Sequence, residues 1–454
     1  MKNTKLTFIP ILAFFLFFCS YAFGTSEEIN QIVQLGLSNS FDIKIENERM
    51  DKAYRTQWNN WSRLLPTLSL SGGRVFDRAQ AYNSGVIDNT KTWYSNLYAN
   101  ANWRIWDNMQ NITNIQQGQI DYQYQKNSSY MRIQEYIIRL VELFLDYELI
   151  KKRQLIETRR LEENQKVLEQ TKQLLDAGVK TRMDVLDVEI QVVDAQRSLS
   201  EITTRLGISK QNLLVQLNSK NDEKLPEFDF FKLAPYYQTY FEERFEDFKA
   251  NWEQKYLQNH FEIRNLSNNL ERSRLSLRQT RLGYFPRLDF TITEQWDYSR
   301  KVSRTGYSEG EDGVLNSTSM GLQLTWTVWD WFATPNNILN EGSNFKIADT
   351  EYRRGLRTIQ REITNSIAQY ELNEMQLKAA KMLLEKSEMW VYHSRERFKL
   401  GRLTNMELQR AINQTYQAKV NVATYLKDKF LYMARILYHM GYDLAPETSA
   451  VPWR

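Results

Sequence analysis

Trp103-Arg104-Ile105-Trp106-Asp107 returns further along the chain as Trp326-Thr327-Val328-Trp329-Asp330. The two copies begin 223 residues apart, and Gly178 and Gly401 are separated by the same interval. Solenoid units recur every roughly 20 to 50 residues, so an interval of this size indicates two structural halves. The chain is therefore predicted to contain an internal duplication, with two copies of one structural unit.

The repeat divides the 454-residue chain into two halves and a connector. Leu65-Pro66 and Phe285-Pro286 open corresponding stretches 220 residues apart, which places a three-residue difference in a loop before Trp103, where insertions are tolerated. One pseudo-symmetric body is expected rather than independent domains. The predicted boundaries are 25–217 for the first repeat, 218–250 for the connector, 251–441 for the second repeat and 442–454 for a C-terminal tail.

Residues 1–24 have the pattern of a secretory signal. Two lysines precede an apolar run from Leu6 to Phe18, and small residues follow it. Removal of the two lysines lowers the formal net charge from +4 to +2, which gives no indication of a nucleic-acid partner. Cys19, the single cysteine, would be lost with this segment. A lipidated Cys19 is the alternative, which the bulky Phe18 before it disfavours.

Four long strands with one apolar and one polar side are predicted. From Trp93 to Ile105 the residues alternate with the period of a β-strand, and residues 320–328 repeat the pattern. Alternating stretches also follow Pro66 and Pro286. For a single strand, the edge of a soluble sheet is the alternative. Strands of about 9 to 11 residues span a bilayer, however, and tryptophans mark its interfaces. The expected membrane-interface aromatics are Trp103, Trp106, Trp326 and Trp329.

Four strands per chain need partner chains to form a barrel. After residue 24 the sequence has no apolar run near the roughly 20 residues of a membrane helix, so a membrane span would consist of strands. The smallest membrane barrels have about eight strands, and lipid does not tolerate an open sheet edge. Two copies would supply eight strands and a filled interior, whereas three copies would supply twelve strands and leave a pore.

Long helices are predicted between the tryptophan motif and the glycine of each half. About 70 residues lie between these landmarks, and a helix of that size is about 100 Å long. Apolar residues recur every seven positions, which predicts left-handed coiled-coil packing. The first series is Leu140, Tyr147, Leu161, Leu168 and Leu175, interrupted only at Gln154, and the second is Ile363, Tyr370, Leu377, Leu384, Val391 and Phe398. Shorter helices are expected at about 27–64, 183–217, 255–284 and 406–439.

This order of elements resembles the TolC family of outer-membrane factors over nearly all of the mature chain. Gly178-Val179-Lys180-Thr181-Arg182-Met183-Asp184-Val185-Leu186-Asp187 is similar to the family's periplasmic turn and the helix start after it. Arg104 and Thr327 stand near positions where family members commonly have proline, a departure that concerns local geometry.

The resemblance implies a mainly α fold with a membrane β-barrel contribution. It implies a homotrimer with a 12-stranded barrel in outer-membrane lipid and an α-helical periplasmic tunnel. It also implies the function of an exit duct in a tripartite efflux or type I secretion system. Such a duct passively conducts substrates delivered by an inner-membrane pump, proton-driven or ABC-type, and a periplasmic adaptor protein. The cargo and the type of pump stay open. The alternative from another class is a periplasmic or surface structural or adhesion protein built on long coiled-coil helices.

Charged residues after the two turns are candidates for a periplasmic gate. They are expected opposite a packed helix face formed by Leu186, Ile190 and Val193. In a trimer each carboxylate would form a ring of three, and such rings select cations or constrict a pore. A solvated outer face, or a closing ion pair across the two halves, is the alternative. The candidates are Asp184 and Asp187 in the first half and Glu407 and Arg410 in the second.

The turns themselves resemble the family's adaptor-docking tips, although ordinary helix-turn chemistry also explains their residues. The candidates for docking are Gly178, Lys180, Thr181, Gly401, Arg402 and Thr404.

No catalytic, cofactor or metal site is predicted. The three histidines, His260, His393 and His439, are scattered, and hydrolase and zinc-protease motifs do not occur. A mature chain without cysteine offers no thiolate. The acidic stretch 309–313 lacks the spacing of a calcium loop and is expected in an exposed barrel loop.

Overall fold

The computed structural model describes residues 27–83, 86–219, 225, 235–303, 313–400 and 402–441. The expected signal segment, Gly401, residues 309–312 of the acidic loop and the expected tail from residue 442 lie outside the described residues. The chain forms two units. One comprises residues 49–126 and 265–353, and the other comprises residues 1–48, 127–264 and 354–454. Helices α2, α3, α6 and α7 contribute to both, and each unit is described by itself.

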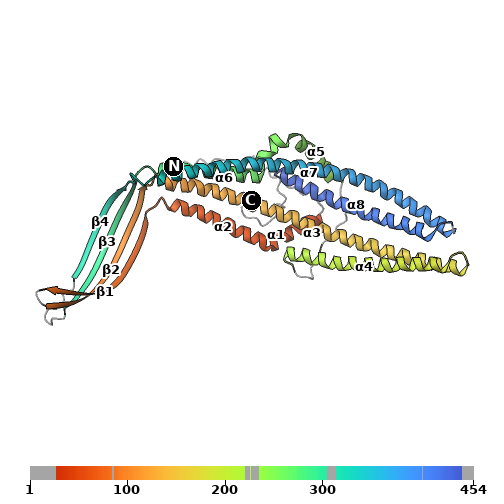
Figure 1. The fold of residues 1–454 in the computed structure, drawn as a ribbon, viewed down its shortest axis with the longest axis horizontal. Coiled ribbons are helices and arrows are strands. Elements are labelled where there is room, and N and C mark those ends of the chain that lie inside the picture. The colour runs from red at the N-terminus through yellow and green to blue at the C-terminus, as the bar shows by residue number, and fades with distance from the viewer. Residues whose placement is uncertain are drawn as a thin grey trace, which may run out of the picture. The chain divides into compact units, whose positions relative to one another are not determined.

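The first of these units contains an antiparallel sheet of four strands in the order β1-β2-β3-β4 (Figure 1). The strands are β1 (Thr67–Asn83), β2 (Val86–Trp106), β3 (Arg287–Ser303) and β4 (Gly313–Thr325). Each repeat supplies one hairpin, and β2 pairs with β3 to join the two hairpins. The predicted number and pairing of strands is therefore confirmed. Within the described residues, β1 and β4 form the two edges of the sheet.

The strand register gives the sheet one apolar and one polar face. Leu68 pairs with Ala101 in the first hairpin, and Leu288 pairs with Leu324 in the second. Between the hairpins Trp103 pairs with Phe290. Polar residues share the other face, because partners in a register point to the same side. The polar set includes Ser69, Asn100, Thr293 and Ser319.

Two local features differ from the predicted alternation. A register shift between Arg104 and Trp106 pairs Trp106 with Leu288, and such a bulge returns Trp106 to the apolar face. Strand β4 ends at Thr325, so the expected continuation of the second strand through Val328 is wrong. The motif Trp326–Asp330 forms a connection without regular secondary structure that leads into the next helix.

The two long helices are confirmed. Helix α3 (Gln110–Asp176) and helix α7 (Ala333–Lys399) contain 67 residues each. Pro335 lies in the first turn of α7, where a missing backbone N–H costs nothing. The shorter helices α4 (Arg182–Leu217) and α8 (Asn405–His439) begin within one residue of the predicted positions. None of the described helices combines the length and the apolar character needed to cross a membrane.

The helices that precede the hairpins differ from the prediction. The expected helix 27–64 is broken at Ser40 into α1 (Glu27–Asn39) and α2 (Phe41–Ser62). The Ser40 hydroxyl accepts a hydrogen bond from the backbone N–H of Asp42 at 3.1 Å and so starts the second helix. The equivalent helix α6 (Phe261–Leu282) starts later than predicted. Helix α5 (Pro235–Asn251) and two short turns over 252–259 precede it.

The larger core of the second unit lies where α1 packs on α3 and the end of α4. Phe144, Leu140 and Ile137 of α3 are fully buried there. The approach of α1 is close at Gly36, where an added Cβ would lie 2.3 Å from Cδ2 of Leu140. The hydroxyl of Tyr136 donates to the backbone oxygen of Gln216 at 2.9 Å and of Gly36 at 3.3 Å, which ties three helices together.

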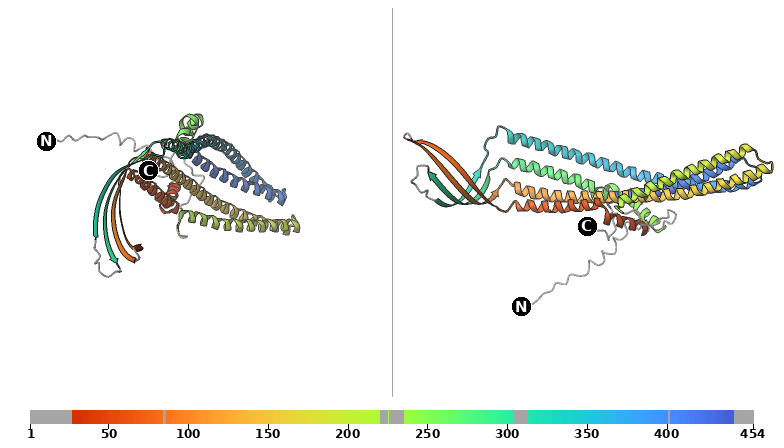
Figure 2. Two further views of the ribbon diagram at one scale, coloured as in Figure 1. Left: turned by 60° about the vertical axis from the view of Figure 1, so that its left-hand side comes forward. Right: turned by 90° about the horizontal axis from the view of Figure 1, so that it is seen from below.

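A second core cluster holds α3, α4, α7 and α8 together. It includes Val167, Val188, Val391, Phe398 and Leu408. Figure 2 shows α4 alongside α3 and α8 alongside α7.

The predicted seven-residue series matches the buried residues best in α7. There Ile363, Tyr370, Leu377, Val391 and Phe398 are buried. In α3 the members Leu161, Leu168 and Leu175 are only half-buried, and Asn164, Val167 and Thr171 occupy the core instead.

Candidate functional site

The turn between α3 and α4 is built on Gly178 and a capping box. Gly178 has a φ of 73°, which favours glycine after a helix end. The backbone N–H of Asp184 donates to the Thr181 hydroxyl at 3.3 Å, and the Asp184 carboxylate accepts from the Thr181 backbone N–H at 2.9 Å. The hydrogen bonds that the Asp184 carboxylate accepts from the backbone N–H and the hydroxyl of Thr181 lower its pKa below the ordinary value. The Asp184 side chain is therefore engaged in starting its own helix.

The turn between α7 and α8 repeats this arrangement with a glutamate. The Glu407 backbone N–H donates to the Thr404 hydroxyl at 3.2 Å, and the Glu407 carboxylate accepts from the Thr404 backbone N–H at 3.0 Å. The same hydrogen bonds lower the pKa of Glu407. Thr181 and Thr404 thus occupy equivalent N-cap positions at an interval of 223 residues.

The two turns contact each other within one chain. The side-chain amide of Asn405 donates to the backbone oxygen of Asp184 at 2.9 Å. The ammonium group of Lys180 lies 5.4 Å from the centre of the Phe398 ring, within the range of a cation–π interaction. Lys180 therefore lies in the expected docking turn and also contacts Phe398 within the chain.

The other two gate candidates, Asp187 and Arg410, have exposed side chains. No ion pair joins them in the part of the chain that the structure describes. The predicted packed face of α4 is wrong, because Leu186, Ile190 and Val193 are exposed in the single chain. The residues that pack are Val185, Val188, Val192 and Ala195. Asp184 is half-buried beside this face, whereas Asp187 points into solvent.

Asn405 and Phe398 were not among the predicted site residues. Phe398 belongs to the seven-residue series, but its contact with Lys180 depends on tertiary packing. The two capping boxes do have a sequence signal, a threonine followed three residues later by a carboxylate. That signal identifies Asp184 and Glu407 as helix-capping residues and does not include Asp187 or Arg410.

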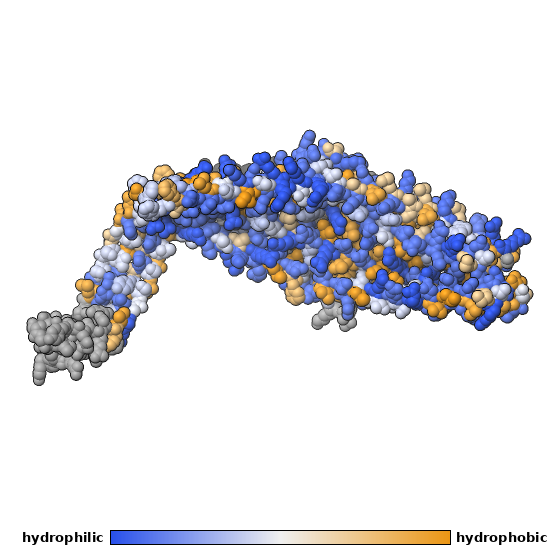
Figure 3. Space-filling view, in the orientation of Figure 1, coloured by the Kyte–Doolittle hydropathy of each residue, from blue (hydrophilic) through white to orange (hydrophobic). Residues whose placement is uncertain are grey.

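In the unit that contains the sheet, tryptophan side chains form hydrogen bonds between the strands and the segments that follow α2 and α6. The indole N–H of Trp103 donates to the backbone oxygen of Leu64 at 3.0 Å. In the second repeat the indole N–H of Trp326 donates to the backbone oxygen of Tyr284, also at 3.0 Å. Trp106 and Trp329, like these two, are exposed. Hydrophobic residues reach the surface where the strands meet the helices (Figure 3).

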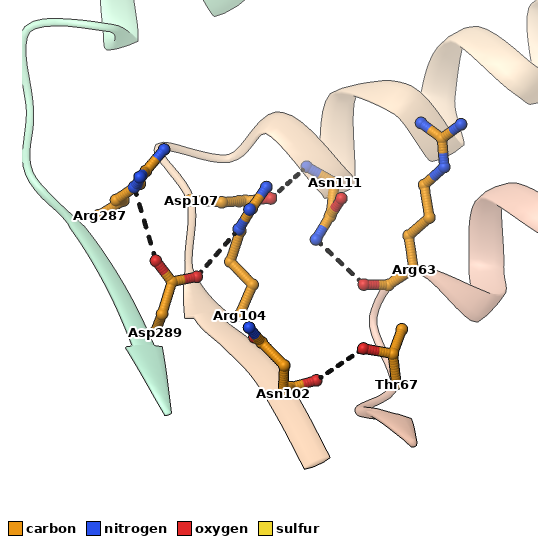
Figure 4. A network of polar contacts seen from close by, with 8 residues as sticks. All are labelled: Arg63, Thr67, Asn102, Arg104, Asp107, Asn111, Arg287 and Asp289. Atoms are coloured by element: carbon orange, nitrogen blue, oxygen red, sulfur yellow. Dashed lines mark hydrogen bonds and ion pairs between the residues drawn. The ribbon is translucent and has the colours of Figure 1, made fainter. Parts of the chain in front are cut away.

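The aspartates of the repeated motif cap the two long helices. The Asp107 carboxylate accepts from the backbone N–H of Asn111 at 2.8 Å (Figure 4). The Asp330 carboxylate accepts from the backbone N–H of Thr334 at 2.7 Å. Two residues with positive φ follow each aspartate, Asn108 and Met109 in the first repeat and Trp331 and Phe332 in the second.

Polar contacts at this junction also join the two repeats. Arg104 of β2 forms an ion pair with Asp289 of β3 at 3.1 Å, and Arg287 approaches the same carboxylate at 3.5 Å (Figure 4). The Asn111 side chain donates to the backbone oxygen of Arg63 at 3.1 Å, which holds the start of α3 against the end of α2.

Two of the three histidines come together, contrary to the prediction that all three are scattered. His260 Nε2 and His439 Nδ1 lie 3.3 Å apart, and the rings are stacked. Burial lowers the pKa of each to about 4. No group of three or more potential ligands that could hold a metal ion occurs among the described residues.

These features define a class of protein: one built from a duplicated unit of a β-hairpin and a long helix, with a four-stranded sheet that has one apolar and one polar face. The chain belongs to the Outer membrane efflux protein family, which it matches over residues 32–219 and 252–429. The chain is thus an efflux protein of the outer membrane. No protein with a curated description matches the sequence.

Solved structures of outer-membrane proteins share the fold. The outer membrane protein VceC from Vibrio cholerae is 10% identical, with a TM-score of 0.73 and coverage of 91% of this chain and 96% of that chain. The CmeC outer membrane channel of Campylobacter jejuni is 14% identical, with a TM-score of 0.71 and coverage of 92% and 86%. The open state of the MtrE outer membrane channel of Neisseria gonorrhoeae is 14% identical, with a TM-score of 0.72 and coverage of 93% and 90%.

Proposed function

We propose that three copies of this chain form the outer-membrane exit duct of a tripartite export system. The observation that carries the proposal is the sheet of four strands with an apolar and a polar face, bounded by β1 and β4. In lipid an open sheet edge leaves backbone groups without hydrogen bonds. Pairing β4 of one copy with β1 of the next would close a barrel of twelve strands with the apolar face towards lipid. Trp103, Trp106, Trp326 and Trp329 would then lie at one membrane interface.

The helices would continue the conduit into the periplasm, and their turns would receive the adaptor. In this proposal Arg402 and Lys180 present positive charge at the tips, next to Gly178, Thr181, Gly401 and Thr404. An inner-membrane pump would supply the energy for transport. The duct would open when the adaptor separates the two turns of each chain.

The gate that we propose rests on Asp187 and Arg410 rather than on all four charged candidates. Asp184 and Glu407 have their carboxylates occupied by capping hydrogen bonds. Asp187 and Arg410 keep exposed charges on the second turns of α4 and α8. In a trimer three copies of Asp187 would form an acidic ring whose strength depends on the distance between the copies.

Membrane fractionation and native mass spectrometry test the duct. The expected result is an integral outer-membrane trimer that forms a conducting pore in planar bilayers. Release of the protein from membranes by mild salt, or a stable monomer in detergent, would contradict the proposal and favour a structural or adhesion protein.

Conductance measurements test the gate. Asp187→Asn should raise single-channel conductance or weaken cation selectivity, because it removes the charge and keeps the size of the side chain. Glu201→Gln on the same helix is the matched control, since Glu201 is engaged with Arg205 at 2.6 Å and lies four turns away. Equal conductance and selectivity in the Asp187→Asn and control channels would remove Asp187 from the gate.

Charge reversal tests the docking turn. Arg402→Glu should reduce co-purification of the cell's own adaptor protein and leave the trimer intact. This substitution is cleaner than Lys180→Glu, because Lys180 also contacts Phe398. Unchanged adaptor recovery with Arg402→Glu would exclude a charge-dependent contact at this tip.

A further inference from the structure

The two repeats of one chain meet at a seam beside the sheet. There the turn after β2 contacts the junction between α6 and β3. The side-chain amide of Asn108 donates to the backbone oxygen of Phe285 at 2.6 Å. A guanidinium nitrogen of Arg278 lies 3.9 Å from the sulfur of Met109. Each side of this seam contributes one polar side chain, Asn108 or Arg278, and the seam joins repeat one to repeat two.

The repeat identifies the residues that would form the same contact at the outer ends of the chain. After the tryptophan motif the interval is 223 residues, so Trp331 corresponds to Asn108 and Phe332 to Met109. Before the strands the interval is 220 residues, so Leu65 corresponds to Phe285 and Trp58 to Arg278.

The structure supports both intervals. The indole hydrogen bonds of Trp103 to Leu64 and of Trp326 to Tyr284 are equivalent in length and partner. The backbone also matches, with φ of 59° and 60° at Asn108 and Met109 and of 52° and 66° at Trp331 and Phe332. The two turns therefore have the same conformation and differ in their side chains.

The outer pair of surfaces is apolar on both sides. In the single chain the exposed fractions are 84% for Trp331 and 60% for Phe332 on one surface. On the other surface they are 60% for Trp58 and 65% for Leu65. Large side chains rarely adopt a positive φ, whereas asparagine does so readily. The aromatic pair thus occupies a backbone conformation that does not favour it, so the local backbone does not account for these two side chains.

We propose that Trp331 and Phe332 of one copy dock on Trp58 and Leu65 of the next copy, forming an aromatic clasp between neighbouring subunits. The inference rests on the proposed assembly, in which β4 of one copy pairs with β1 of the next. It adds a second contact between the same two copies, beside the sheet. The seam within a chain, which is held by polar contacts of Asn108 and Arg278, and the apolar clasp between chains occupy equivalent places in the ring. Apolar surfaces suit the contact that forms last, because their burial drives association of separate chains.

Paired cysteines test the clasp in the full-length protein. Trp331→Cys with Leu65→Cys should give disulfide-linked species of two and three chains on a denaturing gel after mild oxidation. Asn108→Cys with Phe285→Cys is the matched control at the equivalent seam, and it should give a link within one chain and no ladder. Cys19 is the only native cysteine, so the wild-type chain reports the background.

A third cysteine pair separates the clasp from the assembly itself. Asn102 pairs with Thr291 between β2 and β3, and the equivalent positions across subunits are Thr325 and Ser71. Thr325→Cys with Ser71→Cys should therefore give a ladder whenever β4 pairs with β1. A ladder from this pair without one from the clasp pair would overturn the clasp and leave the assembly standing. Absence of both ladders from a monomeric protein would overturn the assembly as well.

A swap of side chains gives an independent readout. Trp331→Asn with Phe332→Met places the residues of the inner seam at the outer surface without changing the backbone requirement. We expect the trimer to dissociate into monomers at a lower temperature in detergent than the wild type. An unchanged dissociation temperature would contradict a contribution of the clasp to the assembly.

Discussion

Asn405 and Asp184 join the two helix turns of the chain: the side-chain amide of Asn405 donates to the backbone oxygen of Asp184 at 2.9 Å. Asn405 begins α8 in the second repeat, and Asp184 lies in the first turn of α4 in the first repeat. The Asn405 side chain is 3% exposed, so water does not readily replace the bond. Separation of the two turns requires this bond to break.

Asn405→Ala should weaken the contact between the turns by about 1 kcal/mol, the usual net value of one hydrogen bond. If the turns move apart when the duct opens, the substitution should also increase the open fraction in single-channel recordings. Asn413→Ala, at an exposed position of the same helix, is the control. Wild-type hydrogen exchange at both turns together with wild-type gating would show that this bond does not hold them.

The two capping boxes should stabilise the helix starts independently of any gate. Thr181→Ala and Thr404→Ala remove the hydroxyl acceptors, and we expect each to cost about 1 kcal/mol of local stability. Hydrogen–deuterium exchange of the first turns of α4 and α8 measures the loss. Thr204→Ala, whose hydroxyl bonds to the preceding turn in the middle of α4, should leave those first turns protected.

The same boxes predict an effect of acid. The folded-state pKa values of Asp184 and Glu407 are lowered by hydrogen bonds to the carboxylates. A depressed carboxyl pKa contributes stability above the unfolded values, which are 3.8 and 4.5, and this contribution is lost as the pH falls through the folded values. Protection of the first turns, corrected for intrinsic exchange, should therefore decrease below about pH 4. Asp184→Asn should remove this dependence from α4 alone, and a persistent dependence there would contradict the assignment.

Much of the fold was predictable because its elements have strong periods. The alternation around Trp103 fixed strand β2, and the seven-residue series fixed the core face of α7. Local departures escaped this reasoning. The bulge after Arg104 and the break at Ser40 depend on one residue each, which a period averaged over many residues does not detect.

The site was less predictable than the fold. The position of the turns follows from Gly178 and Gly401, but the helical spacing that groups Asp184 with Asp187 does not show that Asp184 forms capping hydrogen bonds with Thr181. The face of α4 was misread because Val185 and Leu186 are both apolar. Spacing alone did not decide which of the two packs inside the chain and which stays free for a neighbour.

The buried histidine pair predicts a second pH dependence of the free energy of unfolding, between about pH 6.5 and pH 4. Because the pKa values of His260 and His439 are lowered to about 4 from 6.5, the unfolded chain binds more protons between these values. The free energy of unfolding should therefore be fully maintained above about pH 6.5 and decrease as the pH falls towards 4, by up to about 3 kcal/mol for the first proton.

Unfolding midpoints at about pH 7.5 and pH 5 measure this effect. His260→Gln with His439→Gln should remove most of the difference, whereas His393→Gln, at an exposed position, should preserve it. The nearby Glu262 acts in the opposite direction, since burial raises its pKa and its protonation favours the folded state as the pH falls. An unchanged pH difference in the double variant would mean that other groups cause it.

Gly36 should be required for the packing of α1 on α3. A Cβ at this position would lie 2.3 Å from Cδ2 of Leu140 and 3.1 Å from the hydroxyl of Tyr136, so the buried Leu140 side chain or one of the helices has to shift. Gly36→Ala should lower the free energy of unfolding by about 1–3 kcal/mol, the usual cost of overpacking. Gly207→Ala in α4 is the matched control, because nothing lies within 4 Å of its added Cβ and alanine favours a helix. Equal effects of the two substitutions would indicate that the close approach of α1 is not needed for stability.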